Sequence, residues 1–248
     1  MFDRFDLSPR KPRREAQEAA IAVVPGRASV SISVSSVSLT PLGTERANSR
    51  FLAILTAELR LILKGQKWWW YVVATGLAIT SAVVPSAEAR GLVLACAWIW
   101  PVLLWSSMGI RETRDQTYQL IFSAPHPIAR QLPAVWMAGV LLALLTGCGF
   151  GFRLLLGGNI RGLMAWFFAV LFIPTFALSL GVWSGTGKPF EIFYTLLWYT
   201  GPLHAVPQLD FMASAPATAA TRYPLFYLVL TCILAVASLT GRKHQLKS

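Results

Sequence analysis

Long apolar segments separated by short polar stretches occupy most of this chain. After residue 67, six such segments follow one another: residues 68–84, 91–108, 132–156, 162–183, 192–206 and 224–240. Most of them approach or exceed the roughly 17 residues needed to cross a bilayer as a helix. They lack the polar stripe of a helix that faces water on one side. The pattern predicts an all-α membrane protein with six transmembrane helices in a domain over residues 68–241.

The fifth apolar segment differs from the others because Gly201 and Pro202 interrupt it. Residues 202–212, which follow the break, are too apolar for an ordinary loop and too irregular for a span. Irregular backbone survives at membrane depth only where protein or a water-filled cavity surrounds it. This stretch therefore predicts a re-entrant segment before the last helix.

Residues 49–67 have a helical period with two distinct faces. At 100° per residue, Arg60 and the lysines fall on one face and most of the leucines fall on the other. This predicts an amphipathic helix lying in the membrane interface. Glu58 falls within the apolar face, where a carboxylate either reaches the polar rim or forms an ion pair with a neighbouring helix.

The two ends of the chain lack this organisation. Residues 1–48 are first charged and then rich in Ser, Val and Pro, which is typical of a flexible cytoplasmic tail or linker, with residues 29–34 alternating like an isolated strand. Residues 242–248 are predicted to form a short cytoplasmic tail. The charged beginning, residues 2–6, resembles an interior connector, so we expect related longer chains to carry another membrane half before it.

The charge of the chain is consistent with a membrane location. Only 13% of residues are charged, and 22 Lys and Arg against 11 Asp and Glu give a net charge of +11. Such a balance would suggest nucleic acid in a soluble protein. Here, however, eleven of the cations precede the first apolar segment, as in segments that face anionic lipid. We therefore predict membrane lipids as partners, and no nucleic acid.

The loops also predict an orientation. If the N-terminal side is cytoplasmic, twelve of the sixteen Lys and Arg from Arg46 onward lie in cytoplasmic stretches and four lie outside. Cytoplasmic loops carry the excess of cations in membrane proteins. Both termini are therefore expected in the cytoplasm. The four outer cations are Arg90, Arg153, Arg161 and Arg222.

Catalytic motifs were sought in the polar stretches. The loop at residues 181–189 has the Gly-Lys pair of a phosphate-binding loop, but Val182 and Pro189 replace the required Gly and Ser or Thr. The three histidines have no carboxylate or thiol at ligand spacing, and no Ser or Cys lies in a nucleophile turn. The sequence predicts no catalytic, cofactor or metal site, and thus no enzyme.

The six apolar segments contain no Asp, Glu, Lys or Arg away from their ends. Carriers coupled to ions usually relay protons or bind cations through ionisable groups inside the membrane. If this protein transports a substrate, the energy is therefore expected to come from a separate subunit that hydrolyses ATP.

The stretch between the second and third apolar segments, residues 111–130, resembles the first cytoplasmic loop of ABC-2 type transporter permeases. In that family a Glu at the end of the second span is followed five residues later by Thr, then by an apolar turn, and then by Pro. Glu112, Thr117, Ile121, Phe122 and Pro125 occupy these positions, although Gln116 replaces the usual Gly. The elbow helix and the six spans fit the same layout.

This resemblance implies a permease of an exporter, whose loop helix at about residues 112–122 fits a cleft on an ATP-binding cassette subunit. A second permease half is also implied, either another copy or a separate chain. The charged side chains would contact the ATPase, and the apolar ones would anchor the helix to the bundle. The candidate coupling residues are Glu112, Arg114, Asp115, Thr117, Leu120, Ile121, Phe122 and Pro125, with Glu58 and Arg60 in the elbow helix.

Two other interpretations stay open. The loop could be an amphipathic connector that rests on the membrane, in a scaffold or assembly factor that transports nothing. An intramembrane enzyme is disfavoured because catalysis there would need polar groups inside the spans. The expected location is the plasma membrane of a bacterium.

Overall fold

The computed structural model describes residues 47–114 and 127–245. Side chains are described from Phe51 onward, except at residues 112, 113, 127–130, 216 and 217. Within these ranges the ordered elements are all helices, and no strand is present. The prediction of an all-α fold is therefore confirmed for the described chain.

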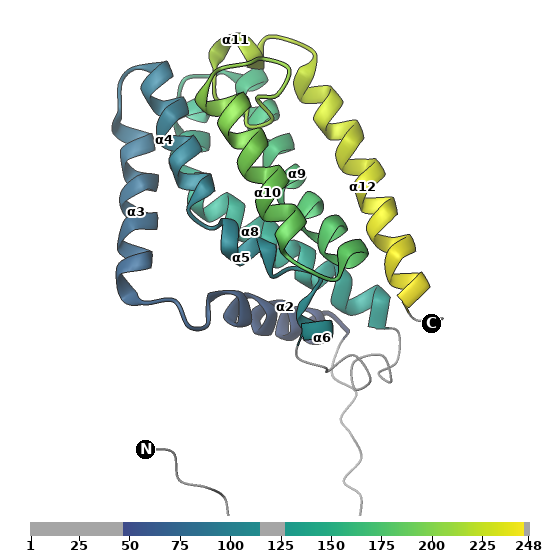
Figure 1. The fold of residues 1–248 in the computed structure, drawn as a ribbon. Helices are drawn as coiled ribbons and strands as arrows, with labels where there is room; N and C mark the ends of the chain where they lie inside the picture. The colour runs from purple at the N-terminus through teal and green to yellow at the C-terminus, as the bar shows by residue number, and fades with distance from the viewer. Residues whose placement is uncertain (1–46, 115–126, 246–248) are drawn as a thin grey trace, which may run out of the picture. The chain divides into compact units, whose positions relative to one another are not determined.

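Each apolar segment corresponds to one helix or a pair of helices (Figure 1). Among the described residues, three helices are long and apolar enough to cross a membrane, at residues 131–156, 160–184 and 223–245. The remaining segments form shorter helices. In chain order the elements are α3 (Trp68–Val83), α4 (Ala87–Ile99), α5 (Val102–Ser106), α8 (Pro127–Leu156), α9 (Ile160–Ser184), α10 (Lys188–Trp198) with the π-helical turn η1 (Tyr199–Leu203), and α12 (Tyr223–Gln245).

The second apolar segment is not one continuous helix. Its helix begins earlier than predicted, at Ala87, where the Ser86 hydroxyl accepts a hydrogen bond from the backbone N–H of Ala89. It ends at Ile99, and a separate short helix follows Pro101. Proline has no N–H to continue the helical hydrogen bonds and its ring crowds the preceding turn. The break divides the segment into α4 and α5.

A helix also forms where the amphipathic period was detected. α2 (Ala47–Leu63) lies across one end of the bundle, next to the short α6 (Arg111–Arg114) (Figure 1). It ends four residues before the predicted limit at Lys67, because Gly65 adopts a φ of 91°, which is incompatible with a right-handed helix. Ile62 is almost fully buried, whereas Arg60 and Lys64 are exposed.

The C-terminal residues extend the last helix further than predicted. Residues 242–245, expected as part of a tail, belong to α12. The Gln245 side-chain amide donates a hydrogen bond to the Val182 carbonyl of α9 at 2.8 Å, and Gly241 packs against Val182 and Trp183. Contact with α9 therefore continues the helix past the end of its apolar stretch.

The core of the bundle lies around α9, which packs against α8, α12, α10 and α5. Trp98, Trp105, Phe172 and Ile173 have almost no exposed surface. These large apolar side chains pack against the neighbouring helices in one hydrophobic core.

Indole N–H groups join the helices across this core. Trp98 and Trp105 donate to the Ala143 and Gly139 carbonyls of α8, at 3.1 and 3.2 Å. Trp198 donates to the Ala95 carbonyl of α4 at 2.9 Å. A buried indole needs such a partner, and the carbonyl has a second lone pair beyond its helical hydrogen bond. These tryptophans therefore act as both packing and hydrogen-bonding groups.

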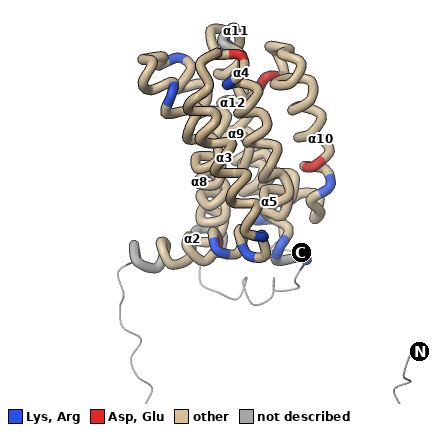
Figure 2. The backbone as a smooth tube through the Cα atoms, turned by 90° about the vertical axis from the view of Figure 1, so that its left-hand side faces the viewer, with Lys and Arg blue, Asp and Glu red and all other residues tan. Residues whose placement is uncertain are grey.

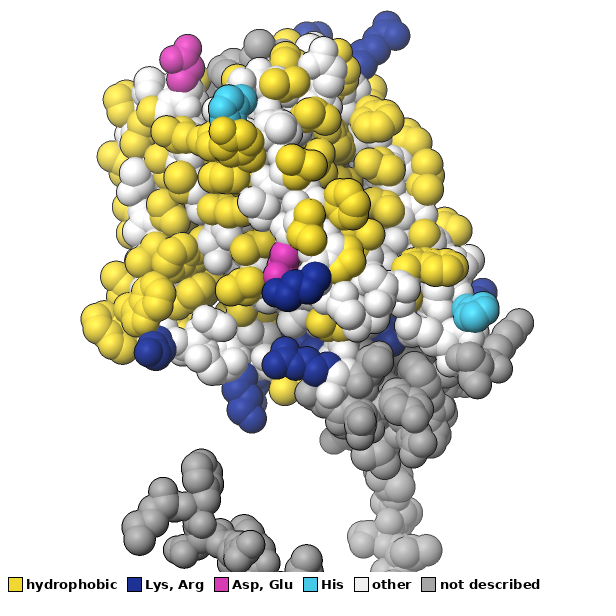
Figure 3. Space-filling model, in the orientation of Figure 1, with side chains coloured by type: hydrophobic (Ala, Val, Ile, Leu, Met, Phe, Trp, Pro, Cys, Tyr) yellow, Lys and Arg dark blue, Asp and Glu magenta, His cyan; other side chains and the backbone are white. Residues whose placement is uncertain are grey.

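Most charged positions lie toward the two ends of the bundle, and those at the start of α10 lie between the ends (Figure 2). In space-filling view, hydrophobic side chains cover most of the visible face, cations gather along its lower margin, and one acidic and one basic side chain lie side by side above that margin (Figure 3). An apolar band between charged ends is the distribution that a bilayer requires. The structure is thus that of a membrane-embedded helical protein.

Residues 199–219 form an irregular cap at the end of the bundle opposite α2, and the short α11 (Pro216–Ala219) is part of it (Figure 1). Phe211 and Met212 are buried among the helices, and the Phe211 ring contacts those of Phe172 and Tyr194. The predicted break at Gly201-Pro202 is present as the π-helical turn. The placement of this cap at membrane depth stays a prediction.

Candidate functional site

The predicted coupling loop begins where α5 turns into α6. Glu112 belongs to α6 by its backbone, and the Arg114 side chain is exposed. Six of the predicted residues lie outside the described chain: Asp115, Thr117, Leu120, Ile121, Phe122 and Pro125. The structure therefore describes the root of the loop, residues 106–114, and the elements to which it is attached.

An ion pair joins this root to α2. The Arg111 guanidinium donates to the Glu58 carboxylate, with Nη1 and Oε2 3.3 Å apart. Both side chains are largely shielded, with 22% and 12% of their surfaces exposed, respectively. Of the two interpretations of Glu58, the structure has the ion pair. A charge in an apolar face is tolerated because an opposite charge and hydrogen bonds compensate for its lost hydration.

Arg111 is also held from its own side. Its Nε and Nη2 atoms donate to the Ser107 hydroxyl, at 3.3 and 3.1 Å. That hydroxyl in turn donates to the Leu104 carbonyl at 2.7 Å. The guanidinium is thus oriented by the end of α5 and directed at α2. A planar group with several fixed donors suits this double role better than a lysine would.

Close backbone contacts attach the same root to the bundle. A Cβ added to Gly181 of α9 would collide with the Met108 carbonyl, and one added to Gly187 would collide with the Ser106 carbonyl. Gly109 has a φ of 78° and lies against Leu178. The residues that begin the loop are therefore packed directly on α9 and on the α9–α10 connection. A displacement of the root would move these elements with it.

The end of α12 completes this side of the molecule. The Trp183 indole of α9 donates to the Ala237 carbonyl at 2.8 Å, and Arg242 is 5% exposed, with its guanidinium donating to Gln245 at 3.2 Å. α9 therefore contacts both the loop root and the last helix at the same end of the bundle.

Sequence reasoning did not select Arg111 or Asp210. In the sequence, Arg111 counted only as one of the cations that predict the orientation. Its position directly before Glu112 was a signal that the loop root carries charges of both signs. Asp210 is 1% exposed, and its signal was a lone carboxylate within an apolar stretch. Arg111 and Asp210 are both ionisable side chains shielded from water, and such residues often have a functional role.

In comparisons with known proteins, the chain matches no family model, no curated protein sequence and no solved structure.

Proposed function

We propose that this protein is a membrane-spanning permease component of an ABC-2 type transporter, an exporter driven by ATP hydrolysis on a partner subunit. In this proposal α3, α4 with α5, and α10 with η1 complete three further crossings, six in all. α2 is the elbow helix in the interface, and the end of the bundle that carries α2 faces the cytoplasm of a bacterium.

The observation that supports this proposal best is the attachment of the loop root. The Glu58–Arg111 ion pair connects it to α2, and the contacts of Met108 and Ser106 with Gly181 and Gly187 connect it to α9 and α10. A docked ATPase that moves as a rigid body needs such direct contact to tilt the helices. A loop that merely rested on the membrane would not require it.

The composition of the helices supports an external energy source. Among the described residues, α3, α8, α9 and α12 carry no charged side chain away from their ends; the Lys188–Glu191 ion pair lies at the start of α10, and the buried Asp210 lies in the cap. Transport coupled to protons or cations usually needs ionisable groups along the pathway. A second permease half, a further copy or a separate chain, would complete the pathway.

The test is co-purification of the full chain, in mild detergent, with an ATP-binding cassette subunit encoded beside its gene. The wild type is expected to retain the ATPase, and Glu112→Ala and Leu120→Asp are expected to lose most of it. Arg153→Gln, at the opposite end of the bundle, is the matched control and should retain the ATPase. If no nucleotide-binding subunit is recovered with the wild type, the permease proposal fails and a scaffold becomes the better explanation.

A further inference from the structure

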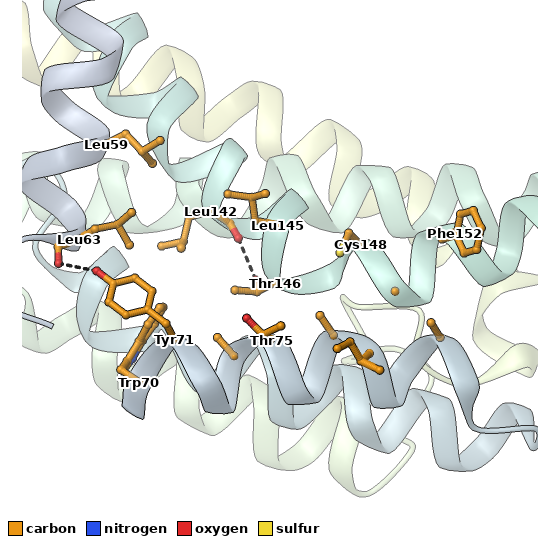
Figure 4. Close-up of a pocket in the computed structure, with 15 residues that line it drawn as sticks. Leu59, Leu63, Trp70, Tyr71, Thr75, Leu142, Leu145, Thr146, Cys148 and Phe152 are labelled. Atoms are coloured by element: carbon orange, nitrogen blue, oxygen red, sulfur yellow. Dashed lines mark hydrogen bonds between the residues drawn. The ribbon is translucent and has the colours of Figure 1, made fainter. Parts of the chain in front are cut away.

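A groove runs along the outer side of the contact between α3 and α8 (Figure 4). Its volume is 640 Å³, within the roughly 300–1,000 Å³ of ligand pockets. α2 closes one end with Leu59 and Leu63, and Phe152 of α8 lies toward the other end (Figure 4). Exposed side chains such as Ile79 and Leu145 also line the groove, so it opens toward the surroundings of the bundle.

Small residues create this groove. Ala74, Ala78 and Gly149 line it, and a Cβ on Gly149 would collide with the Ala78 carbonyl. The two helices therefore meet closely at this point, and the short side chains leave space beside the contact. Because the contact involves the backbone of both helices, the space cannot be filled by a small shift of one side chain.

The walls of the groove present an apolar surface to an occupant. Two of its hydroxyl groups already have protein partners: Tyr71 donates to the Leu63 carbonyl of α2 at 3.1 Å, and Thr146 donates to the Leu142 carbonyl at 2.9 Å. The Thr75 hydroxyl is a further polar group on the groove (Figure 4). A hydrocarbon chain would contact mainly apolar side chains in such a space.

The length of the groove matches one half of a bilayer. The lining residues of α3 extend from Trp70 to Ala82. At 1.5 Å per residue this distance is about 18 Å along the helix. The hydrocarbon of one leaflet is about 15 Å thick. A single acyl chain lying parallel to α3 would therefore reach from the α2 end of the bundle to the depth of the membrane centre.

A cationic pocket continues the groove at its α2 end. This second pocket, of 680 Å³, shares Leu59, Leu63 and Tyr71 with the first and adds Arg60 and Lys64. Arg60 lies in the last turn of α2 and Lys64 directly follows that helix; both are exposed, and among the described residues no carboxylate lines either pocket. Two neighbouring cations at the end of α2 complement the phosphate of a lipid headgroup.

We propose that one anionic phospholipid binds here, with an acyl chain in the α3–α8 groove and its phosphate between Arg60 and Lys64. The charge of the pocket selects an anionic headgroup, and the groove selects a lipid over a free phosphate. This site does not depend on the proposed transport function, since it uses neither the coupling loop nor an ATPase. It gives α2 a role as the clamp of a bound lipid.

The test uses the full chain in detergent, with phosphatidylglycerol or phosphatidylcholine of identical acyl chains added, and counts retained lipids by native mass spectrometry. Wild type should retain one phosphatidylglycerol, with roughly tenfold lower retention of phosphatidylcholine. Arg60→Gln/Lys64→Gln should reduce phosphatidylglycerol to the phosphatidylcholine level. Thr75→Trp, which fills the groove, should reduce both.

Two matched variants separate these effects from changes in net charge or folding. Arg153→Gln/Arg161→Gln removes two exposed cations from the opposite end of the bundle, and Val72→Trp adds the same ring to an exposed position of α3 outside the groove. Both should retain phosphatidylglycerol like the wild type.

Three outcomes would overturn the proposal. Equal retention of the two lipids by the wild type would remove the headgroup site. Unchanged phosphatidylglycerol retention in Arg60→Gln/Lys64→Gln would place the lipid elsewhere. A lipid-free dimer that Thr75→Trp dissociates would assign the groove to a second copy of the chain.

Discussion

The two ends of the bundle each shield a carboxylate, and they compensate for its charge in different ways. At the α2 end, Glu58 pairs with Arg111, 53 residues away in the chain. At the opposite end, Asp210 accepts hydrogen bonds from the Ser214 N–H and hydroxyl and from the Ala215 N–H, all at 3.1 Å. One arrangement joins separate elements and the other is complete within six consecutive residues.

This difference has a mechanical consequence. The Asp210 hydrogen bonds belong to one turn, so this carboxylate is compensated without help from other segments. The Glu58–Arg111 ion pair exists only while α2 and the loop root stay in contact. Separation of the two elements would expose both charges to water. In the proposed transporter, the cap end is therefore the fixed part and the α2 end is the part that responds to a docked subunit.

Removal of the Asp210 carboxylate should have the largest effect. Asp210→Ala leaves two buried backbone N–H groups and a hydroxyl without their acceptor, at a cost of about 3 kcal/mol or more. Thermal unfolding of the purified protein in detergent, followed by circular dichroism, measures the loss. Asp210→Asn keeps one acceptor oxygen, so it should lower the stability less than Asp210→Ala does. Equal losses of stability in the two variants would show that the hydrogen bonds to this carboxylate do not stabilise the protein.

Added methyl groups should disturb both ends by a similar, smaller amount. Gly201→Ala drives a Cβ into the Leu209 carbonyl of the cap, and Gly181→Ala drives one into the Met108 carbonyl beneath the loop root. Overpacking of this kind costs about 1–3 kcal/mol. In the permease proposal, Gly181→Ala should also reduce ATPase stimulation, whereas Gly201→Ala should leave it intact.

The matched control for both glycine variants is Gly76→Ala in α3, where an added Cβ meets nothing within 4 Å. This change should be neutral or stabilise the helix by up to about 1 kcal/mol. The comparison of unfolding midpoints among the three variants tests the packing argument directly. A Gly181→Ala protein as stable as Gly76→Ala would contradict the close attachment of the loop root to α9.

The ion pair should contribute least to stability. A double-mutant cycle with Glu58→Gln and Arg111→Gln is expected to give a coupling energy of about 1 kcal/mol, measured by denaturant or thermal unfolding. The exposed pair of Lys188 and Glu191, 2.7 Å apart, is the matched control and should give less than about 0.5 kcal/mol. Equal coupling energies for the two pairs would mean that shielding from water does not strengthen the Glu58–Arg111 ion pair.

Much of the helical arrangement was readable from local patterns. Apolar segments predicted where helices form, and Gly201-Pro202 predicted where the fifth one breaks. Pro101 carried the same information for the second segment and was not used there, although it divides α4 from α5. Gly65 similarly marked the end of α2. These features depend on residues close together in the chain, so the sequence contains them.

The candidate site could be predicted only in part. The sequence identified Glu58 as a carboxylate that needs an ion-pair partner or access to the polar rim. It did not identify the residue that would form the ion pair. Nothing in the sequence selects Arg111 over the other cations, because the choice depends on α2 crossing the bundle beside α6. The groove likewise required the register at which Gly149 meets Ala78.

The sequence by itself determined the apolar helices, the scarcity of charge along them and the cationic character of the α2 region. Hydrophobic transfer and helix-breaking residues act locally, so they leave a pattern along the chain. Only the tertiary structure decided the partner of Glu58, the shielding of Asp210 and the open groove beside α3. These depend on which helices are neighbours and how closely their backbones approach, and such contacts join residues that lie far apart in the chain.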